Sequence, residues 1–199
     1  MLALLPLVLA FTPSAPAIER EILAAINFAR AQPRTYAEQL RVYRRLFKGK
    51  VVWYPGNPAG LRTAEGVKAV DEAIRFLEKQ PPLPPIAPSP LLALAAGDHV
   101  AEQGPRDGTG HLSKDGANPR DRVLRRGGGS YVAETITYGP PSAAEVVRQL
   151  IVDDDVPGRG HRKTLFAAEM RYAGVACGPH ATYRVMCVAD FGRTPDGRP

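Results

Sequence analysis

The sequence predicts an α+β fold in which helices pack on an antiparallel sheet. The chain has 199 residues, of which 44% are hydrophobic and 23% charged, which is typical of one globular domain with its own core. Helical periodicity occurs mainly in the first half of the chain, and strand alternation occurs near its end. Helices that cluster early and strands that cluster late favour the α+β class.

The first 17 residues, MLALLPLVLAFTPSAPA, have the order of a secretory signal. An apolar core runs from Leu2 to Phe11, and the small-residue motif around Pro16 predicts cleavage after Ala17. A membrane anchor is the rival interpretation, but it requires roughly 20 apolar residues. We therefore expect residues 18–199 to form a soluble domain that is secreted or periplasmic, with no integral membrane segment after cleavage.

Three helices are expected early in the chain, where apolar residues recur at helical spacing over 18–30, 36–47 and 64–79. The segment GKVVWYPGNPAGLR is predicted to be a loop anchored by Trp53. The segment QPPLPPIAPSP predicts a stiff, extended surface strap. A domain linker is the alternative there, but neither flank of the strap makes a core alone.

Capping residues mark the later helices. Ser89 followed by Pro90 predicts a helix start, and Ser142 with Glu145 three residues on predicts a capping box. The remaining elements, in chain order, are a helix over 91–103, a short helix around 120–125, a strand over 132–138, a helix after Ser142 and a hairpin over 172–192.

The two cysteines, Cys177 and Cys187, lie in GVACGPHATYRVMCVADFG. This pattern predicts two short strands around a Gly-Pro-His turn, with the two sulfurs facing each other. Together with export, it favours a disulfide that closes a small loop. Two buried free thiols are the alternative, and a zinc site is disfavoured because no CxxC knuckle is present.

The formal net charge is +6, but the positive residues are scattered apart from short pairs such as Arg44-Arg45 and Arg125-Arg126. Without aromatic interleaving, we expect no nucleic-acid partner. The glycine-rich RRGGGS lacks the GK[ST] of a phosphate loop, and no GxSxG elbow occurs.

Two of the four histidines, His111 and His161, each follow a glycine inside a polar loop with acids near at hand. Glu134 lies on the apolar face of the strand over 132–138, where a carboxylate is costly unless it is paired. Such a set can form a zinc site with an open position or an acid/base cluster. A hydrogen-bonded network that only fixes loops is the alternative, because no HExxH spacing links the residues.

The other candidate side chains have simpler interpretations. His99 is expected to be a satisfied histidine on a packed helix face, and His180 a solvated residue at the hairpin turn. Ser113, close to His111, is a possible nucleophile in principle, although loop serines of this kind are more often caps.

Several motifs in order resemble the CAP superfamily: LLALAAGDHV, GHLSKDG, RDRVLRRGG, VAETITYG, SAAEVVRQLIVDDDVPGRGHRKTLF and AGVACGPH…YRVMCVADFG. This group includes cysteine-rich secretory proteins, antigen 5 and plant pathogenesis-related 1 proteins, also called SCP-like extracellular proteins. The resemblance is strong over 85–192, is greatest to bacterial-type members, and is weaker over the helical part 18–88. It implies a single domain over 18–199 with a three-layer α-β-α sandwich, a central antiparallel sheet and a groove.

In the family that groove holds two histidines and two acids, which bind a divalent metal in some members. By motif, His111 and His161 match the histidines, Glu134 matches the first acid, and Asp153 matches the second, with Asp154 as the fallback. The resemblance thus implies His111, Glu134, Asp153 and His161 as ligands of Zn²⁺ or another divalent cation. The family's usual ENI reads ETI here, and an aspartate as second acid has a shorter reach.

Three functions follow from these observations. The favoured one is a secreted, monomeric domain that binds a lipid, sterol, peptide or cell-wall ligand in the groove. A zinc-dependent hydrolase of peptidase or esterase type is the second, with Glu134 as the base that activates water. The third is a non-catalytic structural or interaction domain in which the four residues only brace loops.

Overall fold

The structure, a computed structural model, describes residues 15–140 and 142–199. The first element, α1, spans Ala15–Ala31. Most of the expected signal segment 1–17 lies outside the described residues, so its cleavage after Ala17 stays a prediction.

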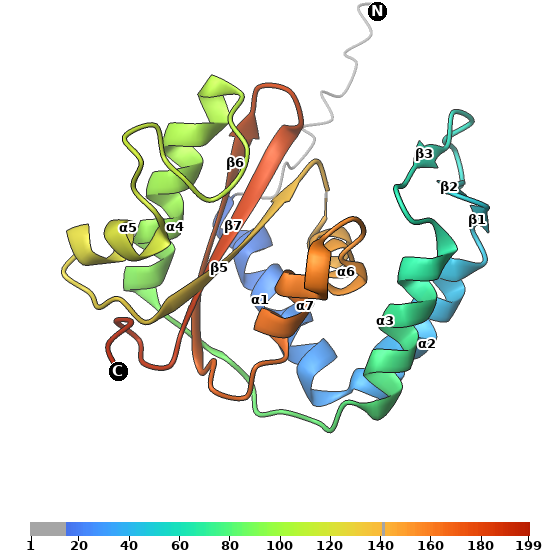
Figure 1. The fold of residues 1–199 in the computed structure, drawn as a ribbon, viewed down its shortest axis with the longest axis horizontal. Helices are drawn as coiled ribbons and strands as arrows, with labels where there is room; N and C mark the ends of the chain where they lie inside the picture. The colour runs from blue at the N-terminus through green and yellow to red at the C-terminus, as the bar shows by residue number, and fades with distance from the viewer. Residues whose placement is uncertain (1–14, 141) are drawn as a thin grey trace, which may run out of the picture.

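A four-stranded sheet lies at the centre of the molecule (Figure 1). In spatial order its strands are β4 (Ala87–Pro88), β6 (Tyr172–His180), β7 (Arg184–Gly192) and β5 (Val132–Tyr138). The last three pair antiparallel, whereas β4 pairs parallel with β6. The α+β class and the central antiparallel sheet are therefore confirmed, and the proline-rich strap adds one parallel strand at the edge.

Helices cover both faces of the sheet and complete three layers (Figure 1). On one face lie α4 (Pro90–Gln103) and α5 (Pro119–Arg125), and on the other lie α1, α6 (Ala143–Val152) and α7 (Gly160–Leu165). Successive strand residues point to opposite faces. Val188 therefore packs in a cluster with α4, whereas Ala189 joins the larger cluster that contains α1 and α6.

Local sequence explains how α4 sits against the sheet. The Ser89 hydroxyl accepts a hydrogen bond from the Leu92 amide at 3.1 Å, so the predicted cap is confirmed. A Cβ at Gly174 would lie only 1.8 Å from the Ala93 nitrogen, so glycine in β6 permits the close approach of this helix. After α4 the chain makes a short 3₁₀ turn, Gly104–Arg106.

The N-terminal part forms a helical arm beyond α7 (Figure 1), made of α2 (Pro33–Arg44) and α3 (Val67–Lys79). The segment predicted to be a loop, 49–62, contains two short strands, β2 (Val51–Val52) and β3 (Leu61–Arg62). Both belong to a small antiparallel sheet with β1 (Phe47–Lys48), which lies where the helix expected over 36–47 was predicted to end, since α2 already ends at Arg44. Trp53 does not anchor the segment, because the residue is 41% exposed. The buried Val52 does so instead.

The C-terminal hairpin brings Cys177 directly opposite Cys187, with their Cα atoms 4.1 Å apart, and a disulfide joins them as predicted. The predicted position of the turn, at Gly-Pro-His, was wrong. Gly178 and Pro179 continue β6, and the chain reverses at residues 181–183.

Candidate functional site

The carboxylate of Glu134 is buried between the sheet and α5, with its side chain 1% exposed. Its Oε1 lies 2.8 Å from His111 Nδ1, and its Oε2 accepts a hydrogen bond from the guanidinium of Arg122. Both oxygens of this strand carboxylate are therefore occupied. The expected pairing is present for one histidine, and the second partner is an arginine rather than the other histidine.

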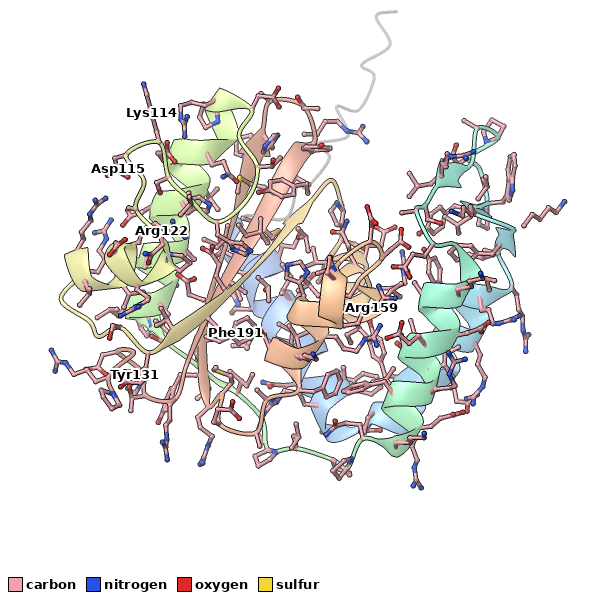
Figure 2. The ribbon with its side chains drawn as sticks, viewed as in Figure 1. Lys114, Asp115, Arg122, Tyr131, Arg159 and Phe191 are labelled. Atoms are coloured by element: carbon pink, nitrogen blue, oxygen red, sulfur yellow. A yellow bond between two sulfur atoms is a disulfide. The ribbon has the colours of Figure 1, made fainter. Side chains whose placement is uncertain are left out.

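Arg122, on α5, links Glu134 to the loop that carries His111 (Figure 2). Its Nη1 donates to the His111 carbonyl at 3.0 Å, the Ala117 carbonyl at 3.1 Å and the Ser113 hydroxyl at 3.2 Å. One buried cation thus neutralises the carboxylate and holds the loop. The His111 side chain remains 49% exposed, so the imidazole lies at the surface with a buried acid behind it.

The second histidine–acid pair lies at the end of α6. Asp153 caps this helix in the left-handed conformation, at φ 58°, which turns its side chain toward α7. Its Oδ1 lies 2.7 Å from His161 Nδ1, and its Oδ2 accepts the Arg162 amide at 3.1 Å. His161 was expected in a loop, but it lies in the first turn of α7.

Asp154 points elsewhere, since its two oxygens accept the backbone amides of Ala64 and Glu65 at 2.7 and 2.8 Å. Of the two adjacent candidates, Asp153 is the one in contact with a histidine. A one-residue shift along the chain separates an acid of the site from an acid that fastens the segment before α3.

The two imidazole rings lie side by side, with centroids 6.5 Å apart. Each uses Nδ1 for its carboxylate, so each leaves Nε2 as the nitrogen that could bind a metal or a ligand. Two imidazoles on one tetrahedral zinc have centroids about 5 Å apart, so the rings would have to approach by about 1 Å.

The donor set fits a metal only in part. All four carboxylate oxygens of Glu134 and Asp153 already accept hydrogen bonds. Within residues 15–140 and 142–199, no group of three or more His, Cys, Asp and Glu side chains is arranged to hold a metal ion. The residues fit a site with two imidazole donors whose acids orient the rings from behind, as outer partners do in many metal sites.

A cluster of ion pairs fastens the loop between Asp153 and His161 to α3. Arg159 donates to both Glu65 and Glu72 and lies between α7 and α3 (Figure 2). Hydrogen bonds from Arg159 lower the pKa of the Glu65 carboxyl to about 2. Arg162 contacts Glu72 at 3.1 Å, and burial lowers the pKa of this guanidinium.

A cavity of ≈ 570 Å³ lies between the helical arm and the sheet, and the His161–Asp153 pair lines it. His111 stands beside His161 but does not line it. The role of residues 34–88, which the sequence left open, is thereby explained in part, because they form one wall. The larger aromatic and aliphatic lining residues are Tyr43, Phe47, Tyr54, Leu61, Ile136, Tyr138, Leu150, Val152, Val156 and Tyr183.

Sequence reasoning missed three residues. Arg122 stands in the motif RDRVLRRGG, where nothing distinguishes it from its neighbours before the helix is placed. Asp190, a lone acid in the apolar strand sequence VMCVADFG, is fully buried beside Glu134, and burial followed by the negative charge of Glu134 raises its pKa well above the usual value. Thr137 lines the cavity, and its buried hydroxyl has no hydrogen-bond partner among the described residues.

Of the predictions for the two remaining histidines, one is confirmed and the other is wrong. His99 is fully buried with its Nε2 2.9 Å from the Gly110 carbonyl, as expected, and burial lowers its pKa. His180 is not solvated, because it is 3% exposed and its Nε2 lies 2.8 Å from the Gly108 carbonyl. It ties the hairpin to the loop before His111.

Two solved structures resemble this fold. An extracellular protein with an SCP domain from Bacillus anthracis aligns at a TM-score of 0.45 and 19% identity, over 63% of this chain and 37% of that one. An outer surface protein from Borrelia burgdorferi aligns at a TM-score of 0.46 and 14% identity, over 62% of this chain and 85% of that one.

No curated protein sequence matches the chain. The family model of the cysteine-rich secretory proteins, CAP, matches residues 24–191. This match spans the sheet, the helices on both of its faces, both histidine–acid pairs and the disulfide. The chain therefore belongs to the cysteine-rich secretory protein family.

Proposed function

We propose that this protein is a secreted binding module whose cavity takes a small lipid-like ligand, with an apolar body and one polar end. The cavity of ≈ 570 Å³ beside His161 is the observation that carries this proposal. Its size falls in the range of about 300–1,000 Å³ that is common for small-molecule sites, and aromatic and aliphatic side chains dominate its walls.

The charges of the lining favour an uncharged body over a charged peptide. Arg148 pairs with Glu145 at 3.2 Å and stacks over the Tyr43 ring, with the guanidinium carbon 4.4 Å from the ring centre. Asp154 is bonded to backbone amides. Arg148 and Asp154 are already satisfied by the protein and offer little to a charged partner. Arg62 also lines the cavity and makes no ion pair among the described residues.

Two polar positions are available to the polar end of the ligand. The Nε2 of His161 is one, because Nδ1 faces Asp153. The Thr137 hydroxyl is the other, because Thr137 lines the cavity and its hydroxyl has no partner among the described residues; the hydroxyl is buried here, so the side chain has to turn toward the ligand. A buried hydroxyl that lacks a partner is costly, and a ligand that bonds to it recovers that cost.

A divalent ion would be held by His111 and His161 through Nε2, while Glu134 and Asp153 orient the rings. Such an ion would supply Lewis acidity at the edge of the cavity. With only two protein donors we expect weak binding, which zinc calorimetry on the chain and on His111→Ala and His161→Ala measures. Both variants should lose the binding, and zinc affinity unchanged in both would contradict this site.

The hydrolase alternative is less well supported. Glu134 would act as the base, but both of its oxygens are engaged, one by His111 and one by Arg122. A carboxylate held in this way orients its partner and is not free to take a proton from water. Turnover of ester or peptide substrates that depends on Glu134 would reinstate this alternative.

The ligand class is tested with a dansyl-labelled long-chain fatty acid as a fluorescent probe. We expect saturable binding of one probe per chain, which unlabelled long-chain fatty acid displaces. Absence of saturable binding would contradict the proposal. Displacement by a short peptide or a soluble cell-wall glycan fragment, and not by fatty acid, would assign the cavity to that ligand class instead.

A further inference from the structure

One stretch of the chain carries several cations and no acid to pair with them. Residues 45–62 contain Arg45, Lys48, Lys50 and Arg62 and no acidic residue. All four are exposed, and none makes an ion pair within the described part of the chain. The neighbouring Arg41 and Arg44, in contrast, pair with acids on α2 and α3.

Lys48 and Arg62 lie on strands of the small sheet β1–β3, and Arg45 and Lys50 lie beside these strands in the sequence. The small sheet projects at one end of the molecule, away from the central sheet (Figure 1). Cross-strand partners share a face. Phe47, Val52 and Leu61 are partners and form one face, of which Phe47 and Leu61 line the cavity.

Lys48, Val51 and Arg62 are partners on the opposite face. Trp53, two residues after Val51, shares that face because strand side chains alternate. Gly60 leaves room for the indole, since a Cβ there would lie 3.3 Å from the ring. An exposed tryptophan thus lies on the same face of the small sheet as a lysine and an arginine.

We propose that this face of the β1–β3 sheet docks the protein on an anionic lipid bilayer, with Lys48 and Arg62 at the headgroups and Trp53 in the interfacial region. Tryptophan is enriched at membrane interfaces, and basic residues gain binding free energy near anionic lipids. A soluble polyanion would use the cations but leave the exposed indole without an apolar partner. No helix within residues 15–140 and 142–199 has the length and hydropathy to span a bilayer.

The docking face lies next to the cavity. Leu61 and Arg62, on β3, line the cavity as well as belonging to the small sheet. Docking on the membrane does not depend on what the cavity binds. Either the docking proposal or the ligand proposal can therefore be refuted while the other stands.

Trp53 is the only tryptophan in the chain, so its fluorescence reports on this face alone. With phosphatidylcholine vesicles that contain phosphatidylglycerol, we expect a blue shift of the emission, quenching by brominated lipid, and reversal by salt. Vesicles of phosphatidylcholine alone should give none of these. No shift and no cosedimentation with the anionic vesicles would overturn the proposal.

The double variant Lys48→Gln/Arg62→Gln should bind anionic vesicles about 25-fold more weakly, at about 5-fold per cation. Lys114→Gln/Arg120→Gln is the matched control, since it removes two exposed cations from the other end of the molecule, where Lys114 is labelled (Figure 2). The control should stay within about twofold. Equal losses in both would indicate unspecific charge attraction and overturn the proposal. So would heparin binding that needs Lys48 and Arg62 while vesicles do not bind.

Discussion

Asp190 lies directly opposite Glu134 in the ladder between β5 and β7, so two carboxyl groups stand side by side in the interior. Only one of them has an arginine, because Arg122 pairs with Glu134. Neither oxygen of Asp190 has a hydrogen-bond partner among the described residues. The acid that orients His111 therefore rests against a second acid, whose pKa is raised by burial and by the charge of Glu134.

Asp190→Asn should stabilise the protein at neutral pH. Burial and the charge of Glu134 raise the folded-state pKa of Asp190, so its contribution to stability is fully present below the unfolded pKa, about 3.9, and is lost as pH rises toward the folded pKa. An amide does not ionise. We expect a gain on the order of 1 kcal/mol in urea unfolding at pH 7 that shrinks toward pH 4, and a loss at pH 7 would contradict it.

Arg122→Met should destabilise the protein by about 3–5 kcal/mol, because it leaves the buried Glu134 carboxylate without its cation. Arg125→Met, an exposed position on the same helix, is the control and should change stability by less than about 0.5 kcal/mol. Adding Glu134→Gln to Arg122→Met should recover part of the loss. If the double variant were less stable than Arg122→Met, the pairing would not be the cause.

Asp153→Ala and Asp154→Ala should differ in kind. Asp153→Ala places an alanine at positive φ, frees the Arg162 amide and releases His161, at a cost of about 2–4 kcal/mol. Asp154→Ala loses two backbone hydrogen bonds near the surface and should cost about 1 kcal/mol. Only Asp153→Ala should alter zinc calorimetry, and an equal effect of Asp154→Ala would contradict the assignment of the second acid.

The ion pairs that Arg159 makes with Glu65 and Glu72 should contribute less to stability in acid. The pKa of Glu65 is lowered to about 2 by hydrogen bonds from Arg159, so its stabilising contribution is present above the unfolded pKa, about 4.3, and is lost as pH falls from there to about 2. Stability measured over this interval should fall less steeply in Glu65→Gln than in the natural chain. Identical slopes would show that the exposed part of this pair is screened by solvent.

Reduction of the Cys177–Cys187 disulfide should destabilise the chain without unfolding it. The bond closes a loop with a sequence separation of 10, for which chain entropy gives about 2.7 kcal/mol. For a chain of this size the midpoint of thermal unfolding should fall by roughly 5–10 °C. Cys177→Ser/Cys187→Ser should show the same shift and lose all response to dithiothreitol. If the midpoint of thermal unfolding did not change on reduction, the disulfide would not contribute to stability.

The elements with strong periodicity could be predicted from sequence, because their signals are local. The helices after Ser89 and Ser142, and the strand that carries Glu134, begin where their caps and alternation indicate. The β1–β3 strands are two residues each, too short for a periodic pattern to emerge. His180 shows the same limit, since its burial depends on a contact with Gly108, 72 residues away.

The candidate site divides in the same way. Motif resemblance pointed to His111, Glu134, Asp153 and His161. The pairing of each histidine with its own acid, however, is a property of the tertiary structure. Arg122 and Asp190 act only because α5 and β7 bring them to Glu134, and no spacing in the sequence encodes that approach. Thr137 required knowledge of which strand face borders the cavity.

Two threonines on β5 test the central claim, that the cavity beside His161 binds the ligand. Thr137 and Thr135 both have buried hydroxyls without a partner among the described residues, but only Thr137 lines the cavity. The measurement is the dissociation constant of the dansyl fatty acid for the natural chain, Thr137→Val and Thr135→Val. We predict affinity about 2- to 12-fold weaker in Thr137→Val and unchanged in Thr135→Val. Binding that is unchanged in Thr137→Val, or weakened equally in both, would contradict the claim.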